Sequence, residues 1–453
     1  MNRIRQNLML CALLGTSLLG GSCNKSPEAY GPGAANPEFL ARSLNRLTEV
    51  IIYDIFSPPV ASRIYAYSSI AAYEALVPGY PDCVSLAGQL NGLEPGPQPE
   101  ADQEYCLPLA AVHAFLTVGR TLVFSEDSIA RFEAKLEAEF EKVGVPASVR
   151  KRSLAYGEAV AAHIMAWSGS DNYKQTRTFP RYTVTGDKER WKPTPPAYMD
   201  AIEPHWNRIR PFVIDSATQF VPVPPTAFDL KEGSAFYKEM MEVYEVGVNL
   251  TEEQREIAKF WDCNPFVMHT QGHVMYATKK ITPGGHWMGI ATIAARQSGA
   301  DIMKTAETYA LTAVSLADGF ISCWDEKYRS SLIRPETVIN EHIDEKWAPL
   351  LQTPPFPEYT SGHSVISTSA ATMLTSLYGD NFAFLDTTEV PYGLPPRQFQ
   401  SFRDAAAEAA ISRLYGGIHY MPAISNGVGQ GRKVGEYVVA NIRTRSEQTA
   451  SNP

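Results

Sequence analysis

The amino-acid sequence predicts a mainly α-helical protein, and three observations support that fold class. Apolar residues recur at spacings of three and four through most of the chain, as they do on the buried face of a helix. The strict alternation of a half-buried strand is scarce, and no segment repeats with a constant period. At 453 residues the chain suits one large helical domain or two fused ones. We therefore expect helical bundles with little sheet.

Residues 1–23 have the composition of an export signal. Two arginines precede an apolar run from Leu8 to Leu19, and small residues then lead to Cys23. The end of this segment resembles the lipobox of bacterial lipoproteins, with its leucine one residue farther from the cysteine than usual. We expect an exported protein held in the bacterial envelope, in the periplasm or at the outer membrane, by a lipid on Cys23. A plain secretion signal with an incidental cysteine is the alternative.

A flexible tether at 24–36 leads from this signal to two helical regions, at 37–228 and 229–445, which are expected to share a core. Residues 80–104 are rich in glycine, proline and acidic residues and are expected to form a loop. Helical periodicity is found near 39–55, 64–76, 105–122, 126–143 and 147–168 in the first region, and near 232–246, 251–262, 287–299, 301–326, 362–378, 399–415 and 424–443 in the second.

Residues 169–228 interrupt the helical pattern. They contain nine prolines and several aromatic residues, among them Trp191, Trp206 and Phe212. A stretch of this length without periodicity in a compact protein is usually either a functional cover or a surface wrap. A lid or pocket wall and plain structural packing therefore both remain open for this segment.

The charge balance restricts the kinds of partner. The formal net charge is −9 and the pI is about 5.6, so the surface as a whole does not attract nucleic acid or an anionic membrane. Any strongly positive field must therefore be local, inside a pocket. Beyond the export signal, no stretch reaches the roughly 20 apolar residues that a helix needs to cross a bilayer.

Four cysteines follow the export signal: Cys83, Cys106, Cys263 and Cys323. Export permits disulfides, and four thiols allow three pairings. The favoured local pair is Cys83 with Cys106, because these residues bracket a loop rich in proline and glycine. The sequence has no Cys-x-x-Cys and no Cys/His pattern with zinc spacing, so a cysteine metal site is not expected.

Three short clusters in the C-terminal region, at 327–335, 357–363 and 412–419, carry the chemistry. Together they contain Lys327, Arg334, Arg413, the pair Ser361-Gly362, and the histidines His363 and His419. Cationic side chains, a hydroxyl, an exposed backbone amide and acid/base groups are what a protein needs to bind a tetrahedral oxyanion and act on it.

In the first cluster, Lys327 and Arg334 are seven residues apart, so on a helix they would share one face. Pro335 disfavours helical dihedral angles at Arg334, so we expect the helix to end there and the arginine to bend back. Two cations can then converge on one anion. The alternative is an ordinary solvated helix face.

In the second cluster, a helix is expected to begin near Ser361. The first turn of a helix offers unpaired N–H groups and a positive dipole end, and Gly362 lets an oxyanion approach the backbone closely. Ser361 can add a hydroxyl donor, and His363 can act as general acid or base. The alternative is a capping serine followed by an incidental histidine.

In the third cluster, Arg413 and His419 would point to different faces of an unbroken helix, because they are six residues apart. The pair Gly416-Gly417 lies between them and can break the helix. Both side chains can then reach one site.

The order Lys-x6-Arg-Pro, Ser-Gly-His, Ser-Arg-x5-His resembles the signature of the vanadium-dependent haloperoxidase and type 2 phosphatidic acid phosphatase superfamily. The lead-in at 321–327, the run Pro355-Phe356-Pro357 and the early stretch 65–75 are similar to the haloperoxidase branch. The resemblance covers most of residues 37–443. It implies an α-helical bundle that holds vanadate, or phosphate, in one pocket.

The resemblance also implies roles for the oxyanion-binding residues. Lys327, Arg334 and Arg413 would neutralise the oxyanion, while the Ser361 hydroxyl and the Gly362 amide would donate hydrogen bonds to it.

The histidines and aromatic residues receive roles in the same way. His419 would be the axial ligand of vanadium, or in a phosphatase the nucleophile, and His363 the acid/base group. Phe356 matches a position next to the cofactor that bears on halide choice, and Trp324 would line the same region. His286, in a Gly-Gly-His-Trp turn before a helix, is expected at the pocket rim, with a simple capping turn as the alternative.

Three functions fit this site. The first is oxidation of a halide by hydrogen peroxide at a histidine-bound vanadate, and it is favoured by Phe356 and the long N-terminal region. The second is an exported acid phosphatase that acts on phosphomonoesters through a phosphohistidine, and the third is a degenerate member that only binds phosphate. The corresponding partners are peroxide with a halide, or a phosphomonoester. The membrane is expected only through the lipid anchor, nucleic acid is excluded, and a homodimer is the assembly to test.

One residue departs from the family pattern. Phosphatase-type members have an aspartate four residues beyond the last histidine, where it orients that histidine, and this chain has Ala423 there. Either another acceptor holds His419, or its basicity and its affinity for vanadate are reduced.

Overall fold

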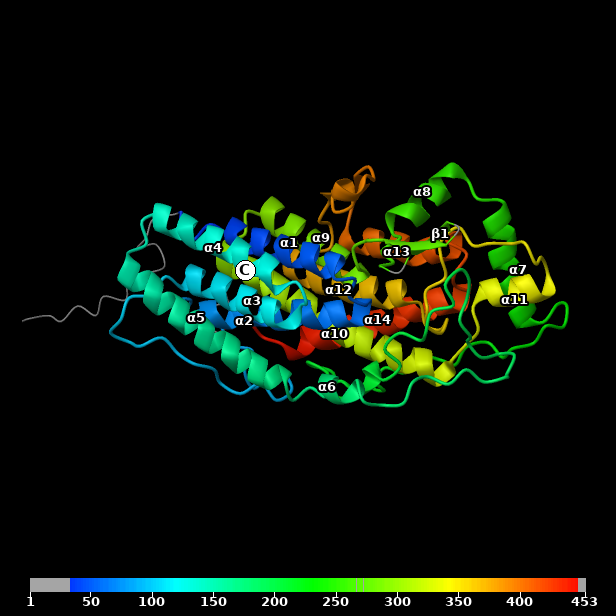
Figure 1. The fold of residues 1–453 in the computed structure, drawn as a ribbon, viewed down its shortest axis with the longest axis horizontal. Coiled ribbons are helices and arrows are strands. Elements are labelled where there is room, and N and C mark those ends of the chain that lie inside the picture. Colours follow the sequence, from blue (N-terminus) through cyan, green and yellow to red (C-terminus); the bar gives the residue numbers. More distant parts are fainter. Residues whose placement is uncertain (1–32, 266, 272, 447–453) are drawn as a thin grey trace, which may run out of the picture.

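The structure, a computed structural model, describes residues 33–265, 267–271 and 273–446, which form one elongated helical body (Figure 1). Helices α1 to α5 gather at one end, and α7, α8 and α11 lie at the other (Figure 1). The mainly α-helical class predicted from the sequence is confirmed. The export signal predicted at 1–23 lies outside the described residues.

The helices match most of the predicted ones to within a few residues. The α-helices are α1 (Glu38–Tyr53), α2 (Pro58–Leu76), α3 (Leu107–Leu122), α4 (Glu126–Lys142), α5 (Ala147–Ser168), α6 (Tyr173–Thr176), α7 (Ala235–Val248), α8 (Glu252–Phe260), α9 (Pro283–Gln297), α10 (Ile302–Ser330), α11 (Pro335–His342), α12 (Gly362–Tyr378), α13 (Phe402–Tyr415) and α14 (Met421–Asn441). Short 3-10 turns are η2 (Val77–Gly79), η3 (Trp206–Arg208) and η4 (Val390–Tyr392).

Strands within the described residues are limited to two antiparallel hairpins. In the first, β1 (Val267–Gln271) pairs with β2 (Val274–Thr278), with Val267 opposite Thr278. In the second, β3 (Phe384–Asp386) pairs with β4 (Arg397–Phe399), with Phe384 opposite Phe399. The sequence did not predict these hairpins, because strands of three to five residues leave too little alternation to recognise.

Helix α10 runs through the middle of the body and packs on α2, α9, α12 and α14 (Figure 1). Its N-terminus is capped by Asp301, whose side chain accepts a hydrogen bond from the Lys304 amide at 2.7 Å. One continuous hydrophobic cluster joins Phe39 near the start of the chain to Ile442 near its end. Residues of both predicted regions therefore lie in one hydrophobic core. None of the described helices combines the length and the apolar character needed to cross a bilayer.

The irregular segment 169–228 packs along α10 as a wrap. The backbone amides of Phe212, Val213 and Ile214 donate to the buried Asp318 carboxylate at 2.6, 2.7 and 3.0 Å. Burial raises the pKa of Asp318 to about 6, against the lowering effect of these amides. Trp191 is also buried, and its amide donates to the Ser331 carbonyl at 2.8 Å. Structural packing is therefore one role of this segment.

Helix α10 ends between the last residue of the predicted helical pattern, 326, and Arg334, where Pro335 was expected to end it. It stops at Ser330, and the next residue, Ser331, has the left-handed φ of 49°. Arg334 is the N-cap of the following helix, with extended φ and ψ of −79° and 149°. The effect of Pro335 on Arg334 is as expected, but Lys327 and Arg334 lie on different helices and not on one face.

The cysteine prediction was wrong. Cys83, Cys106, Cys263 and Cys323 are all buried thiols without disulfides. Cys83 lies beside the chain end, where its Sγ accepts from Arg445 Nη1 at 2.9 Å, while Cys106 starts α3 with its amide bonded to Ser153. The described part of the predicted tether, residues 33–36, forms a turn with Ala34 buried, so the packed structure begins before residue 37.

Candidate active site

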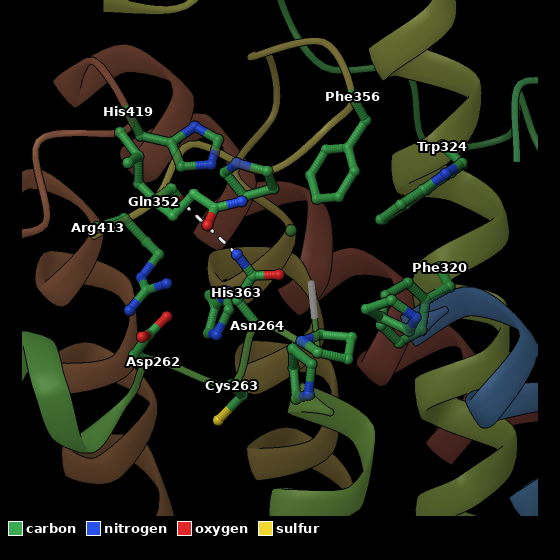
Figure 2. A pocket seen from close by; sticks show the side chains of 16 residues that line it. Asp262, Cys263, Asn264, Phe320, Trp324, Gln352, Phe356, His363, Arg413 and His419 are labelled. Atoms are coloured by element: carbon green, nitrogen blue, oxygen red, sulfur yellow. Dashed lines mark hydrogen bonds between the residues drawn. The ribbon is translucent and has the colours of Figure 1, made fainter. Parts of the chain in front are cut away.

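A cavity brings the three sequence clusters together. It holds about 510 Å³ that no protein atom fills, part of it open to solvent. The residues that line it include Trp324, Phe356, Gly362, His363, Arg413 and His419. Figure 2 shows His419, Arg413 and His363 on one side of this pocket and the aromatic rings of Trp324, Phe356 and Phe320 on the other. The pocket thus has a polar wall facing an apolar one.

His419 sits on the loop between α13 and α14. Gly417 makes this loop possible, because its φ of 75° ends the helix before His419 and favours glycine. The Nδ1 atom of His419 lies 2.7 Å from Glu358 Oε1, which also accepts from the Tyr420 amide at 3.0 Å. Arg334 Nη1 lies 3.2 Å from the other ring nitrogen, Nε2.

These contacts set the tautomer of His419. Because Glu358 Oε1 already accepts from a backbone amide, it accepts from Nδ1–H as well, and Nε2 keeps its lone pair. Burial and the nearby cations, Arg334 first among them, hold the pKa of His419 well below its usual range. His419 is therefore a neutral imidazole whose unprotonated Nε2 lies beside Arg334.

Glu358 is itself fully buried. Burial raises its pKa to about 8, against the lowering effects of Arg334 and Lys327. Its Oε2 atom has no hydrogen-bond partner among the described residues. The proton of the neutral carboxyl can therefore sit on Oε2 while Oε1 continues to accept from His419.

Helix α12 begins at the pocket, as the sequence predicts. Ser361 is its N-cap, with Oγ accepting from the Ser364 amide at 3.3 Å. A Cβ on Gly362 would lie 3.8 Å from Trp324 and 3.9 Å from Lys327, so glycine keeps this approach open. Helix N–H groups and the dipole make such an end attractive to an anion.

His363 follows in the first turn of α12. Its Nε2 atom is buried and has no hydrogen-bond partner among the described residues, while its ring also bonds to the Trp261 backbone. Burial, followed by the Arg413 charge, holds the pKa of His363 well below its usual range. His363 is thus a neutral base with a free nitrogen in the pocket wall.

Three buried cations surround the two histidines. Lys327 Nζ donates to the carbonyls of Pro357, Glu358 and Thr360, at 3.1, 3.1 and 2.5 Å. Arg334 donates to Phe356 and Ile418 carbonyls, and its Nη2 has no partner among the described residues. Burial lowers the pKa of Lys327 to about 8 and that of Arg334 to about 10.

The third cation, Arg413, is also held by the backbone. Its Nη2 donates to the Trp261 carbonyl at 2.8 Å, and burial lowers its pKa while the charge of Asp262 raises it. Asp262 offsets only part of the charge of the three cations, because Glu358 is a neutral carboxyl below its pKa of about 8. An anion in the pocket would relieve this imbalance.

The aromatic wall is held by the wrapping segment. The Trp324 and Phe356 rings lie 5.0 Å apart, and the Trp324 indole N–H donates to the Ile202 carbonyl at 3.2 Å. Tyr328 OH donates to the same carbonyl, and the Ile202 amide bonds to Pro355. The segment 169–228 therefore also supports the pocket wall, although the described contacts show packing and not a movable lid.

Comparison with known proteins identifies the family. The family described as "VCPO second helical-bundle domain" matches residues 307–448. A solved bacterial vanadium-dependent iodoperoxidase is 55% identical, with 91% of this chain and 98% of that one covered and a TM-score of 0.87. This chain belongs to the vanadium-dependent haloperoxidase family. No protein with a curated function matches it.

More distant members of the haloperoxidase family share the fold. A holo-type bacterial vanadium-dependent chloroperoxidase is 16% identical with a TM-score of 0.68, covering 90% of this chain and 97% of that one. An apo-type bacterial vanadium-dependent chloroperoxidase is also 16% identical with a TM-score of 0.65, covering 86% of this chain and 96% of that one.

Within this haloperoxidase fold, the structure places most predicted site residues together. Gly362, His363, Arg413, His419, Trp324 and Phe356 line the cavity, and Lys327, Arg334 and Ser361 lie next to that lining. His286 does not line it. The ring of His286 is fully buried, with Nε2 2.7 Å from Asp386 and its face stacked on Trp261, so the predicted place at the pocket rim was wrong.

Glu358 is the functional residue that sequence reasoning missed. It takes the orienting place that Ala423 leaves open, from 61 positions before His419. Ala423 instead contributes its carbonyl, which accepts from the Ser361 amide at 3.0 Å. The sequence offered one signal for this role: Glu358 directly follows Pro355-Phe356-Pro357 and is the only charged residue in an otherwise uncharged run.

We predict that Glu358→Leu weakens vanadate binding by about 10–100-fold, the usual cost of losing a group that orients a metal-ligating histidine. Glu358→Gln keeps the shape and the acceptor oxygen of a neutral carboxyl, so it is expected to restore most of the affinity. The measurement is vanadate binding by equilibrium dialysis. Equal losses in both variants, with native circular dichroism, would contradict a positioning role.

The two neutral histidines predict a pH-dependent stability. Because the pKa values of His363 and His419 are depressed in the folded state, the unfolded chain binds more protons below about pH 6.5, and the free energy of unfolding falls there. Each contributes up to about 1.4 kcal/mol per pH unit. The raised pKa of Glu358 acts in the opposite sense between its unfolded value and about 8. Urea unfolding at pH 6.5 and 5 should show a smaller loss for His363→Gln than for wild type, and equal losses would contradict the assignment.

Proposed function

We propose that this protein binds vanadate at His419 and uses hydrogen peroxide to oxidise a halide. The observation that carries the proposal is the neutral His419 ring, which lines a cavity bordered by three buried cations and whose unprotonated Nε2 lies 3.2 Å from Arg334 Nη1. The family assignment supports the same chemistry. The 55% sequence identity with a bacterial vanadium-dependent iodoperoxidase favours iodide as the halide.

The residues fit a vanadate-sized oxyanion. Arg334 Nη2 and His363 Nε2 are buried polar atoms without partners among the described residues. His363 lines the cavity, and Arg334 contacts His419, which lines it too. Gly362 leaves room at the helix start that a side chain would narrow. Arg334, Lys327 and Arg413 would balance the negative charge of the anion, and His419 Nε2 would ligate the metal. The Ser361 hydroxyl and the Gly362 amide would donate hydrogen bonds.

Vanadate held there would supply a Lewis-acidic centre that activates peroxide toward a halide. The protein's own contribution begins with His363, whose neutral Nε2 can take a proton from the entering peroxide and return one later. Glu358 keeps His419 in the ligating tautomer throughout. The rings of Trp324 and Phe356 exclude water from the opposite wall and provide a polarizable surface for a large halide.

A paired assay tests the proposal. Purified protein freed of vanadate is titrated with vanadate in the presence of peroxide and iodide, beside phosphate release from an aryl phosphate. We expect iodide oxidation to rise and saturate near one vanadate per chain. Phosphate release that vanadate only inhibits, without iodide oxidation, would assign a phosphatase. Neither activity, with phosphate still bound, would assign a binding protein.

We also propose that the chain is exported and anchored by a lipid on Cys23, based on the sequence of residues 1–23. Expressed with its signal in a bacterium, the wild type is expected to incorporate labelled fatty acid and to partition into detergent. Cys23→Ser is expected to lose both properties, and Cys11→Ser to keep them. Detergent partition that Cys23→Ser does not change would contradict the anchor. The predicted homodimer is tested by gel filtration of Cys23→Ser, which should elute at twice the mass of one chain.

A further inference from the structure

A second cluster of potential ligands lies beside the oxyanion pocket and takes no part in the chemistry above. Its members are Cys263 on the connection from α8 to β1, His286 in the first turn of α9, and Glu389 just after β3. The Cys263 Sγ lies 3.4 Å from His286 Nδ1 and 3.8 Å from Glu389 Oε1, and Nδ1 lies 3.1 Å from the same Oε1. All three residues are buried.

These distances are those of one face of a metal coordination tetrahedron. Zinc binds sulfur at about 2.3 Å and histidine nitrogen or carboxylate oxygen at about 2.0–2.2 Å, which in tetrahedral geometry separates the donors by roughly 3.3–3.6 Å. The three observed separations, 3.1, 3.4 and 3.8 Å, bracket that range. One ion could therefore contact all three atoms after small movements.

The histidine is also prepared as a ligand. Its far nitrogen, Nε2, lies 2.7 Å from Asp386 Oδ2, and the other oxygen of Asp386 accepts from the Thr388 amide at 2.9 Å. In the metal-free protein Nδ1 carries a proton that faces Glu389 Oε1 at 3.1 Å. A metal ion bound at this point would displace that proton and take the Nδ1 lone pair, while Asp386 keeps the proton on Nε2. This arrangement of carboxylate, histidine and metal is common at zinc sites, where it fixes the ring and raises its basicity.

We propose that Cys263, His286 and Glu389 bind one divalent transition-metal ion of the zinc class, with Asp386 as the supporting carboxylate. One thiolate, one imidazole and one carboxylate form a mixed sulfur, nitrogen and oxygen donor set of the kind that suits zinc better than calcium or magnesium. Three protein donors leave a fourth position for water. The ligands come from three separate segments, so the spacing of residues in the sequence, which predicted no cysteine metal site, does not reveal it.

The metal would secure one wall of the oxyanion pocket. Cys263 lies two residues after Trp261, whose carbonyl accepts from Arg413 at 2.8 Å and whose backbone bonds to His363. Figure 2 shows Cys263 at the end of the pocket far from His419. The ion would tie this segment to α9 and to the β3–β4 connection without touching the oxyanion. Its binding does not depend on the function proposed above.

A second group, His113, Glu133 and Glu137, is less suited to a metal but useful as a control. His113 Nδ1 lies 2.6 Å from Glu133 Oε1, and His113 Nε2 lies 3.2 Å from Glu158 Oε2. The group contains no thiol ligand. A metal held there would not respond to changes at Cys263.

The test measures metal content and ligand identity in the full-length protein. After passage over a chelating resin, zinc is quantified by mass spectrometry with and without one equivalent of added zinc chloride, and cobalt(II) is added to a separate sample. We expect about one zinc per wild-type chain, and a cobalt complex with the near-ultraviolet charge-transfer band of a thiolate ligand. Cys263→Ser is expected to lose the band, and Cys263→Ser, His286→Gln and Glu389→Gln to retain at least tenfold less zinc.

The matched controls are Cys106→Ser, a buried thiol outside the cluster, and His113→Gln, and both should behave as wild type. Wild-type protein that retains less than a tenth of an equivalent of zinc and shows no thiolate-to-cobalt band overturns the proposal. So does a band that Cys263→Ser leaves unchanged, or zinc that only His113→Gln removes. The wild-type measurements decide the question even if a cluster variant fails to fold.

Discussion

Replacing His419 by alanine is expected to abolish vanadate binding and halide oxidation together. The variant loses the only neutral, oriented nitrogen assigned as a metal ligand in the proposed site, while Glu358 and Arg334 lose their shared partner. We expect kcat/KM for iodide oxidation to fall by at least about 10³-fold, the upper range for removing a single stabilising donor, because His419 would bond to the reacting centre itself. The measurements are vanadate equilibrium dialysis and initial rates of iodide oxidation.

The matched control for this variant is His163→Ala. His163 bonds through Nε2 to the Glu94 carbonyl at 2.9 Å, far in sequence from the three clusters and outside the lining of the pocket. Its loss should leave vanadate binding and turnover unchanged. Wild-type activity in His419→Ala, with vanadate still bound, would overturn the site assignment.

Replacing His363 by alanine should separate turnover from binding. His363 contributes a proton acceptor and no metal ligand, so we expect kcat to fall by about 10²–10⁴-fold, the range for losing a general acid or base. Vanadate affinity should change by less than about tenfold, because the three cations and His419 remain. The dependence of the rate on peroxide concentration and the dissociation constant for vanadate are measured on the same samples.

The pH profile adds a check that a purely structural role for His363 would not pass. Because the pKa of His363 is held well below its usual range, His363 becomes protonated only in distinctly acidic solution. The wild-type rate should therefore fall in an acidic limb of the pH profile. In His363→Ala that acidic limb should disappear. An unchanged limb together with an unchanged kcat would assign the proton transfer to another group.

The helices could be predicted from the sequence because their signals are local. Residues 147–168 and 362–378 were predicted as helices and are α5 and α12, and α12 is bounded by the capping Ser361 and by Gly379 with a φ of 93°. The exact end of α10 could not be predicted, because a serine rarely adopts the left-handed conformation that Ser331 has, and its neighbours do not indicate it. The two short hairpins were not predicted, because strands of three to five residues show too little alternation of apolar and polar residues.

The site was predictable to the extent that each cluster is contiguous. Ser361, Gly362 and His363 occupy one helix start, so their joint role follows from sequence spacing. The contact between Glu358 and His419 depends on how two distant loops meet. The alanine at 423 left open that another acceptor holds His419, but the sequence did not show which residue it is. The same holds for Cys263, His286 and Glu389, which only the fold brings together. In both cases tertiary packing brings the residues together, and the spacing of residues along the sequence does not reveal it.

The most direct measurement is a crystal structure of the protein soaked in orthovanadate, with diffraction data collected on both sides of the vanadium absorption edge. We predict one strong anomalous peak in the cavity, bonded to His419 Nε2 and adjoining Arg334 and Gly362. The peak should be absent from His419→Ala crystals treated in the same way. A vanadium site elsewhere on the molecule, or no site at saturating vanadate, would contradict a histidine-bound vanadate as the centre of this enzyme.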